Sequence, residues 1–444
     1  MKQGKSNRTQ MTQIEQINAV KISDDLPNQS NLSSIPKHWS WVKLGDVCEQ
    51  VNKVKDFNKD GSFYYLDIGG INNKKNLIES VKEYEWRTAP SRAKQIVRSG
   101  DVLFSTVRTY LKNIAKVPLL YDNQIASTGF CIIRPQRNLL NTEYIFYLTL
   151  YDKFLAPLNA LQVGSSYPAV RNGEVLKQVI PLPPLPEQKK IVEKIEELFS
   201  GLDSGVASLQ KAKEQLRIYR QSVLAYAFSG KLTGAVKGET KNGELPEGWE
   251  WVKLNEVLEV KDGTHDTPKY KGKGIPFITQ KNIKNGEFVF DGYNLISKED
   301  HQKFYKRSNV TFNDIIISMI GANRGMSTIV KTKEVFSIKN VGLVKTEEGK
   351  LLSKFLDYFF KSEVGQKSIL SKSKGGAQQF IGLTELRNWL VPLIPITMQT
   401  QIVEEIESRF AGSEALEKAI DDSLAKSEIL RQSILSQAFS GKLV

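Results

Sequence analysis

The chain has 444 residues, of which 40% are hydrophobic and 25% charged, and its formal net charge is +13. These values are ordinary for a soluble globular protein, and the length favours two or three domains. No apolar run approaches the roughly 18 residues that span a bilayer, and residues 1–20 lack the apolar core of a secretory signal, so we expect a cytoplasmic protein without a membrane partner. The two cysteines, Cys48 and Cys131, are too few for a zinc site of their own or for a disulfide framework.

The N-terminal part of the chain divides into a tail and a globular block. Residues 1–34 are polar, rich in Asn, Gln and Ser, and unlike any other segment, so we predict a mobile tail or an arm that contacts a partner. Residues 35–180 form the first globular block. Short strands are predicted in it at Tyr64–Ile71, Asp101–Val107 and Gly129–Pro135. Residues 144–155 predict an amphipathic helix.

A long helix is predicted within residues 181–232, followed by a linker at residues 233–244. From Ile191 to Leu232 the chain is rich in Glu, Lys, Gln, Ala, Leu and Ile and has no proline. Pro186 precedes this stretch, at a place where helices tolerate proline. About 42 helical residues extend roughly 60 Å, too far for one small domain to bury.

The second half of the chain repeats this order. Residues 245–391 form a second globular block and residues 392–444 a second long helix. Strands are predicted at Ile275–Thr279, Asp314–Ile320 and Val341–Thr346. Residues 353–370 predict an amphipathic helix. The fold class is therefore an α+β block present twice, each copy followed by a long helix.

The repeat is also visible in the residues themselves. The segments Ile191–Leu232 and Ile402–Leu443 align without a gap and share about 18 of 42 residues, including the endings Ala227–Leu232 and Ala438–Leu443. The blocks open alike, with Trp-Ser-Trp-Val-Lys-Leu and Trp-Glu-Trp-Val-Lys-Leu, but their interiors differ. Similar frames around different interiors indicate one scaffold that carries two different binding faces.

Both long helices show a heptad pattern, which predicts a supercoiled pair. In the first helix one seam is predicted at Ile195, Leu202, Leu209, Leu216 and Val223, and the other at Ile191, Leu198, Gly205, Ala212, Tyr219 and Tyr226. In the second helix the seams are predicted at Ile406, Ile420 and Ile434, and at Ile402, Leu416 and Leu430. The simplest arrangement is an antiparallel coiled coil with internal pseudo-two-fold symmetry. The alternative is that each helix packs on its own block or on another subunit.

The positive charge lies in the two globular blocks. Residues 36–180 contain 20 Lys and Arg against 13 Asp and Glu, and residues 246–391 contain 23 against 17, which gives +7 and +6. A basic block is typical of proteins that bind a polyanion, although many basic proteins bind none. Nucleic acid is therefore a candidate partner.

Polar and aromatic residues alternate in the predicted loops of both blocks. Asn, Gln and Arg recognise base edges, and Lys holds phosphates, although a polar loop residue is usually only solvated. The candidates for contact with DNA are Arg108, Tyr167 and Arg171 in the first block, and His265, Lys269, Tyr270, Lys281, Asn282, Arg324, Gln378 and Gln379 in the second.

Catalytic and cofactor motifs were not found in the sequence. There is no phosphate-binding loop and no glycine-rich dinucleotide motif. The three histidines, His38, His265 and His301, have no partners at the spacing of a metal site or a catalytic triad. We therefore predict no catalytic residue, no metal and no cofactor in this chain, while a nuclease with an unrecognised carboxylate cluster stays open.

These features resemble the specificity subunit of type I restriction–modification enzymes. The resemblance rests on residues 180–199, on the Arg-Gln-Ser and Ala-Phe-Ser-Gly-Lys-Leu segments of both helices, on the paired openings of the blocks, and on residues 263–283. Such subunits carry two target-recognition domains, each of which recognises half of a bipartite DNA site, and two helical spacers that set the gap.

The resemblance also implies partners. Two methyltransferase subunits that use S-adenosylmethionine, and restriction subunits that use ATP and Mg²⁺, would assemble on this non-catalytic chain. We place their docking near the helix ends, at Phe199, Phe228, Phe410 and Phe439, which fall outside the predicted seams; the alternative is that these residues pack on the neighbouring block. A competing function from another class is a coiled-coil adaptor that joins two protein-binding domains.

Overall fold

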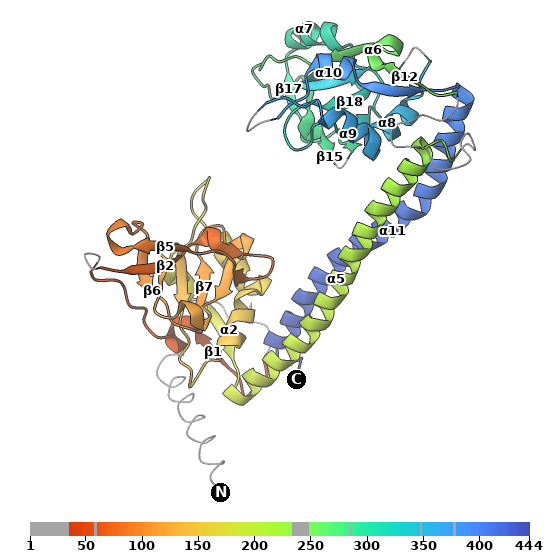
Figure 1. The fold of residues 1–444 in the computed structure, drawn as a ribbon. Helices are drawn as coiled ribbons and strands as arrows, with labels where there is room; N and C mark the ends of the chain where they lie inside the picture. The colour runs from red at the N-terminus through yellow and green to blue at the C-terminus, as the bar shows by residue number, and fades with distance from the viewer. Residues whose placement is uncertain (1–34, 57–59, 233–247, 285, 347–348, 376–378) are drawn as a thin grey trace. The chain divides into compact units, whose positions relative to one another are not determined.

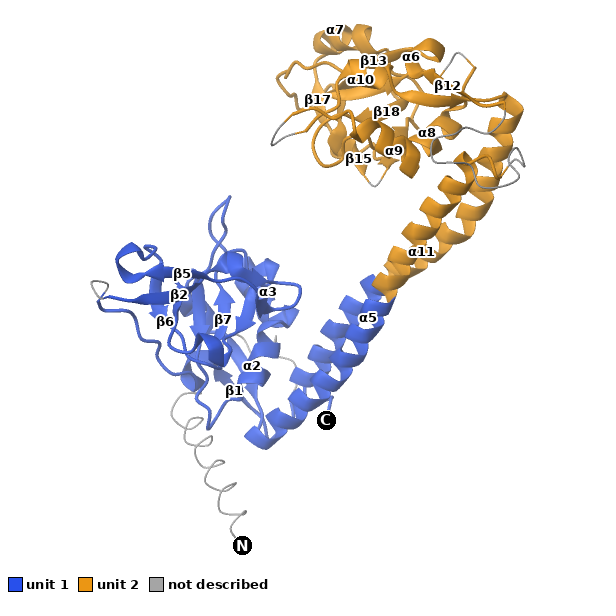
Figure 2. Cartoon of the chain, in the orientation of Figure 1, with its two compact units in different colours: residues 1–208, 423–444 blue, residues 209–422 orange. Residues whose placement is uncertain are grey.

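The structure is a computed structural model that describes residues 35–56, 60–232, 248–284, 286–346, 349–375 and 379–444, and Figure 1 shows its fold. The chain divides into two compact units, which Figure 2 colours separately. Unit 1 comprises residues 1–208 and 423–444, and unit 2 comprises residues 209–422. Each unit contains one α+β domain together with part of each long helix, α5 (Leu185–Phe228) and α11 (Ile396–Phe439).

Domain 1, residues 35–184, is built from short strands. Its first strand, β1 (Ser40–Lys43), pairs antiparallel with its last, β11 (Val179–Leu182), so both ends of the domain meet beside the start of α5. A four-stranded sheet has the order β5-β2-β9-β6, and a three-stranded sheet has the order β10-β7-β8. The strands are β2 (Ser62–Leu66), β3 (Ile71–Asn72), β4 (Leu77–Ile78), β5 (Lys82–Glu85), β6 (Ala93–Ile96), β7 (Val102–Ser105), β8 (Ile114–Lys116), β9 (Ile125–Ser127) and β10 (Phe130–Ile133). The helices are α2 (Thr142–Thr149), α3 (Asp152–Ala160) and α4 (Asn172–Leu176).

Domain 2, residues 248–395, is built in the same way. Its first strand, β12 (Glu250–Lys253), pairs antiparallel with its last, β22 (Leu390–Leu393). One sheet has the order β13-β21-β18-β19 and another β17-β14-β20. The strands are β13 (Val260–Asp262), β14 (Ile275–Thr279), β15 (Ile283–Lys284), β16 (Glu287–Phe288), β17 (Asn294–Ile296), β18 (Ile315–Ser318), β19 (Ser327–Ile329), β20 (Ser337–Lys339) and β21 (Val341–Val344). The helices are α6 (Leu254–Val257), α7 (Lys298–Ser308), α8 (Ser353–Lys361), α9 (Glu363–Leu370) and α10 (Leu383–Arg387).

The two long helices pack antiparallel in each unit. In unit 1, Arg431 of α11 pairs with Asp203 of α5. In unit 2, Lys213 lies 2.6 Å from Asp421, and Arg220 lies 2.6 Å from Glu417. Residue numbers rise on one helix as they fall on the other, which confirms the antiparallel pair expected as the simplest arrangement. The alternative, in which the two helices do not pair with each other, does not hold for this chain.

The seam of the helix pair differs from its prediction by one residue. One series of positions, in steps of seven residues from Ile195 on α5 and from Ile406 on α11, faces the partner helix as predicted. The second series of contact positions lies four residues after the first series, and not three as predicted. Tyr219, Leu416 and Leu430 are therefore 43%, 51% and 48% exposed. The second position is occupied instead by charged residues such as Lys213, Arg220, Glu417 and Arg431, whose aliphatic stems cover the seam while their charges pair across it. An apolar pattern cannot show such positions.

Each domain packs its main core against the ends of both helices. In unit 1, Tyr144 and Ile180 of the domain share a buried cluster with Ile195 of α5 and Phe439 of α11. In unit 2, the equivalent cluster joins Trp389 and Phe355 to Phe228 of α5 and Ile406 of α11. Five of the six predicted strands are confirmed, but of Tyr64–Ile71 only the first three residues belong to β2, and a 3₁₀ helix follows at Ile68–Gly70. Each predicted domain helix is broken in two, into α2 and α3 and into α8 and α9.

Within the described residues, none of the helices has the length and apolar character that crossing a membrane would require.

The two cysteines of the chain both lie in domain 1. Cys131 lies in the core of domain 1 and Cys48 is partly buried against it, and burial raises the pKa of both thiols to about 12. Neither cysteine is therefore a reactive thiolate.

Candidate nucleic-acid interface

The candidate residues of domain 2 gather where several strands end. Strand β14 runs parallel to β20, with Thr279 opposite Lys339, so both carboxyl ends reach the same edge of the sheet. Ser318, the last residue of β18, lies opposite Val341, the first residue of β21, beside that edge. We call the loops that leave these strand ends the loop edge of domain 2.

The loop after β18 holds Arg324 against a hairpin. The hairpin is closed by Lys374 and Phe380, and Phe380 also pairs with Ile320 of the loop. Arg324 donates from Nε to Ser373 Oγ at 3.1 Å and from Nη2 to Gln379 Oε1. Two of the predicted contacts, Arg324 and Gln379, are thus brought together, while Gln378 lies outside the described residues.

The turn after β14 presents Lys281 at the same edge. Gln280 and Ser318 are joined by a hydrogen bond of 3.3 Å, which places this turn beside the end of β18. Asn282 is only 4% exposed; its amide donates to the carbonyl oxygens of Val289 and Asp291 at 3.0 and 2.9 Å. Asn282 therefore shapes the turn from within, and Lys281, which is exposed, is the residue that can reach a ligand.

His265 belongs to the loop edge as well. Its Nδ1 lies 2.8 Å from Oδ1 of Asn340, the residue that follows β20, and its Nε2 lies 3.1 Å from Oδ2 of Asp262. Lys269 and Tyr270 are exposed but do not lie at the loop edge. The next residue, Lys271, pairs with Leu295 near the start of β14. Lys269 and Tyr270 therefore lie toward the other end of that strand.

Domain 1 has an equivalent loop edge. Strand β2 runs parallel to β9, with Leu66 opposite Ala126, and Ser105 at the end of β7 lies opposite Phe130 at the start of β10. The loop after β7 again pairs with a hairpin, which Val163 and Ala169 close. The two hairpins occupy matching positions in the sequence repeat, so the same element meets the same loop in both domains.

Arg108 and Tyr167 meet at this hairpin. The Arg108 guanidinium lies 4.6 Å from the centre of the Tyr167 ring, and its Nη2 donates to Ser166 O at 2.7 Å. Arg108 has a left-handed backbone with φ of 50°, held by its N–H, which donates to Pro168 O at 2.7 Å. Tyr167 is 72% exposed. Arg171 follows directly after Val170, whose N–H donates to Thr106 O, so it too lies beside this loop.

Several residues at the two edges escaped the sequence analysis. In domain 1 they are Asp67, Arg92 and Thr128, and in domain 2 they are Gln280, Lys339 and Asn340. The N–H of Thr128 donates to Arg92 O at 2.9 Å, which places these two residues side by side at the edge of domain 1. The sequence alone does not single these residues out, because they come together only through the parallel pairing of the strands next to them. That pairing cannot be read from the sequence.

The four phenylalanines predicted as partner anchors divide into two kinds. Phe228 and Phe439 are 7% and 3% exposed and pack on aromatic rings of the neighbouring domain. These two residues therefore follow the alternative prediction, packing on the neighbouring block. Phe199 and Phe410 also pack on the neighbouring domain, against the rings of Tyr147 and Tyr358 at centroid distances of 5.7 and 5.8 Å. They are only half-buried, and they lie under Arg431 and Arg220 at 4.8 and 5.7 Å.

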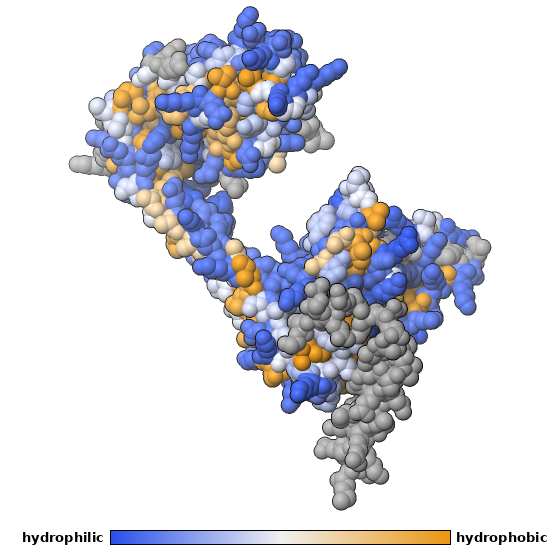
Figure 3. Space-filling view, turned by 180° about the vertical axis from the view of Figure 1, so that it is seen from behind, coloured by the Kyte–Doolittle hydropathy of each residue, from blue (hydrophilic) through white to orange (hydrophobic). Residues whose placement is uncertain are grey.

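Other apolar side chains on the helices are more exposed than these phenylalanines. They are Ile218 and Tyr219 on α5 (53% and 43%) and Ile429 and Leu430 on α11 (70% and 48%), and each pair occupies the same position of the repeat. Hydrophobic patches interrupt the hydrophilic surface of the helices in the space-filling view (Figure 3). These exposed apolar pairs therefore lie in the last third of each helix and not at the predicted anchors.

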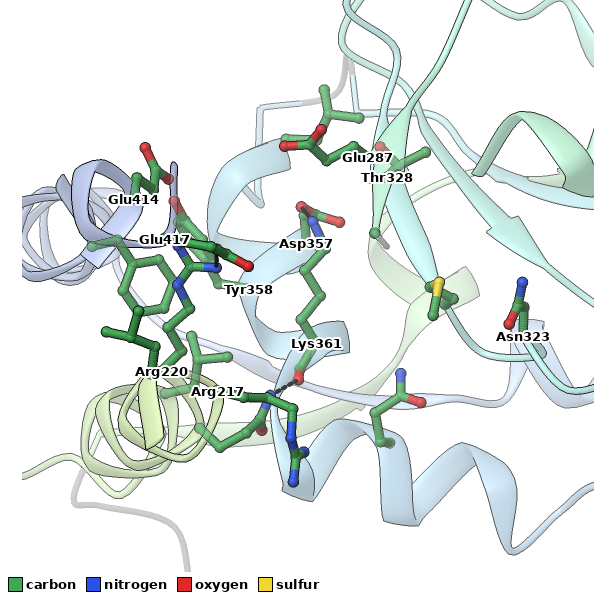
Figure 4. A pocket seen from close by; sticks show the side chains of 18 of the residues that line it. Arg217, Arg220, Glu287, Asn323, Thr328, Asp357, Tyr358, Lys361, Glu414 and Glu417 are labelled. Atoms are coloured by element: carbon green, nitrogen blue, oxygen red, sulfur yellow. Dashed lines mark hydrogen bonds and ion pairs between the residues drawn. The ribbon is translucent and has the colours of Figure 1, made fainter. Parts of the chain in front are cut away.

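A groove of about 930 Å³ lies in unit 2 between the helix pair and domain 2 (Figure 4). Its charged side chains pair with one another: Arg220 with Glu417 and Lys361 with Asp357, both at 2.6 Å. Across the described residues no group of three or more His, Cys, Asp or Glu side chains is placed to hold a metal ion.

Comparison with known proteins identifies the family. The model of the type I restriction modification DNA specificity domain matches residues 36–212 and 246–426. The specificity subunit of the type I restriction enzyme EcoBI from Escherichia coli is 32% identical over 325 residues, which cover 70% of this chain and 68% of that protein. The EcoDI subunit from Escherichia coli is 23% identical over 448 residues, covering 92% and 89%. A solved chain, from work on complex assembly and conformational transition of the type I R-M system, matches with a TM-score of 0.71 and 31% identity over 93% of this chain and 100% of that one. The chain therefore belongs to the family of type I restriction–modification DNA specificity subunits.

Proposed function

We propose that this chain gives a type I restriction–modification complex its DNA sequence specificity, with each domain recognising one half of a bipartite site. The observation that carries the proposal is the pair of equivalent loop edges, each with an arginine held by a hairpin, Arg108 in domain 1 and Arg324 in domain 2. Both edges belong to basic domains, which favours a DNA partner over a protein partner.

The edges combine groups that contact bases with groups that contact phosphates. Arg324 uses three of its five N–H groups within the domain, and Arg108 uses one in the described structure, so both retain donors for a base edge. We assign Arg108, Tyr167, Arg324, Gln378 and Gln379 to bases. We assign Arg171, Lys269, Tyr270 and Lys281 to the phosphate backbone or to its approach, because lysine and exposed flanking residues position the duplex.

The long helices set the distance between the half-sites and carry the partner subunits. In this proposal, two methyltransferase subunits that hold S-adenosylmethionine dock on the equivalent apolar pairs Ile218–Tyr219 and Ile429–Leu430. Two equivalent surfaces on a repeated chain suit two copies of one partner. Restriction subunits that use ATP and Mg²⁺ join the same complex, which acts on DNA in the cytoplasm, and this chain contributes no catalytic group.

The two arginines provide a direct test of DNA recognition. Arg108→Ala is expected to cost about 1–3 kcal/mol of discrimination at one base pair of the first half-site, and Arg324→Ala to do the same in the second, because each removes donors from one edge. Binding of the full-length chain to duplexes with every single-base change measures this. Arg98→Ala, which removes an exposed arginine near the opposite end of β7, is the matched control and should change no position. Uniform weakening on all sequences would instead make the two arginines phosphate contacts, and unchanged binding would remove them from the interface.

A further inference from the structure

A chain of four side chains ends at Asn340 on the loop edge of domain 2. Arg307 of α7 donates from Nε and Nη2 to the two carboxylate oxygens of Asp262, both at 2.8 Å. Asp262 is 5% exposed and also lies 3.1 Å from Nε2 of His265. The other ring nitrogen of His265 lies 2.8 Å from Oδ1 of Asn340. Each group fixes the orientation of the next, and the chain of contacts ends at Asn340 on the edge.

The backbone of Asn340 is held as firmly as its side chain. Its φ is 53°, in the left-handed region that Asn adopts more readily than most residues. Its N–H donates to Thr264 O at 3.1 Å, and the N–H of Gly263 donates to Val341 O at 2.9 Å. A Cβ on Gly263 would lie 2.5 Å from Ile338 O, so a glycine is needed for the loop to approach β20 this closely. The loop and the strand end therefore form one rigid support for the Asn340 amide.

The amide keeps one acceptor and one donor for a ligand. Where Nδ1 carries a proton, it donates to Oδ1, the amide atom that faces it; where it does not, the amide is turned by 180° so that one N–H donates to Nδ1. In both cases an oxygen lone pair and at least one N–H remain. Asparagine recognises adenine in the major groove with this pair, accepting from N6 and donating to N7.

We propose that Asn340 selects adenine at one position of the half-site that domain 2 recognises, and that His265, Asp262 and Arg307 are its positioning residues. This inference rests on the proposed function and specifies one base of the site. The matching place in domain 1, after β9, is occupied by Thr128, whose single hydroxyl cannot form the bidentate contact. The assignment therefore holds for the second half-site alone.

The test is selection of binding sequences from randomised DNA duplexes with the full-length chain. For Asn340→Gly, which keeps the left-handed backbone, discrimination at one adenine of one half-site is expected to fall about 5- to 150-fold, the equivalent of about 1–3 kcal/mol. The other half-site and the gap should stay as they are. Asn340→Asp replaces the donor by an acceptor, so the preferred base at that position is expected to change from adenine to cytosine.

Two further variants separate positioning from general stability. His265→Ala should relax the same adenine, and His265→Gln, whose amide can again bond to Asn340, should restore part of the preference. A merely structural role would lower affinity for all sequences and relax no single position. Asn313→Gly is the matched control, because Asn313 is also left-handed but precedes the opposite end of β18.

The outcomes distinguish this inference from the function on which it rests. If the unaltered chain selects no sequence, the proposed function fails. Suppose instead that the unaltered chain selects a bipartite site. If Asn340→Gly then changes base discrimination at no position, or lowers it at a position that is not adenine, the assignment of Asn340 is overturned while the proposed function stands.

Discussion

Replacing Arg134 by Met is expected to lower the free energy of unfolding of unit 1 by about 3–5 kcal/mol, because it leaves a buried carboxylate without its cation. Arg134 and Asp101 are 5% and 1% exposed. Arg134 donates from Nε and Nη2 to the two oxygens of Asp101 at 2.9 and 2.7 Å, and from Nη2 to Ile96 O at 3.0 Å. The side-chain hydrogen bond with Asp101 raises the pKa of Arg134, so the guanidinium stays charged.

Urea denaturation of the full-length chain measures the change, with hydrogen exchange of residues 35–184 locating it in domain 1. The double variant Asp101→Leu with Arg134→Met is expected to regain part of the loss, since no buried charge then remains unpaired. A loss below about 1 kcal/mol for Arg134→Met would contradict the assignment of a buried ion pair, being typical of an exposed one. The equivalent pair in domain 2, Asp314 with Lys345, is less well matched, because burial raises the pKa of Asp314 despite the nearby lysine.

Gly441→Ala is expected to loosen the attachment of α11 to domain 1. Gly441 follows the helix with φ of 73°, which costs an alanine roughly 1–2 kcal/mol. A Cβ there would also lie 2.3 and 2.5 Å from two ring atoms of Pro36, which cannot rotate away, and 3.4 Å from Trp39. The substitution therefore disturbs the contact between the end of the second helix and the start of the domain.

Thermal unfolding gives the readout. Gly441→Ala should lower the melting temperature, whereas Gly201→Ala should leave it unchanged or raise it slightly, since Gly201 lies within α5 with open space around its Cα. Equal effects of the two substitutions would contradict the contact. The shared Ser-Gly-Lys-Leu endings of the two helices are explained in part by this turn, because Gly230 after α5 has a φ of 72°.

The strands and the helix pair were predictable because the sequence patterns that indicate them are local or occur in both repeats. The strand Ile275–Thr279 has the same bounds in the sequence and in the structure, since a short run of apolar residues lies between turn residues. The heptads predicted a helix pair, and the antiparallel direction was expected only as its simplest arrangement. The second seam was not predicted, because Lys213, Arg220 and Glu417 occupy it as ion pairs that an apolar pattern cannot contain.

The candidate site was predictable only in part. Residue type drew attention to Arg108, Tyr167 and Arg324, and the hairpins bring them to the loop edges. Asn282 has the right amide but is buried in its own turn, and Asn340 was missed because its importance comes from the parallel pairing of β14 with β20. Long-range pairing decides which polar loop residues meet, and one sequence contains no direct record of it.

Modification mapping of genomic DNA after exchange of domain 1 tests the central claim most directly. Residues 36–180 would be replaced by the corresponding block of another specificity subunit, with the partner subunits unchanged. The methylated site is expected to be bipartite, with one half altered and the other half and the gap retained, because each loop edge belongs to one domain and the helices are untouched. A site in which both halves change together, or neither changes, would contradict the account.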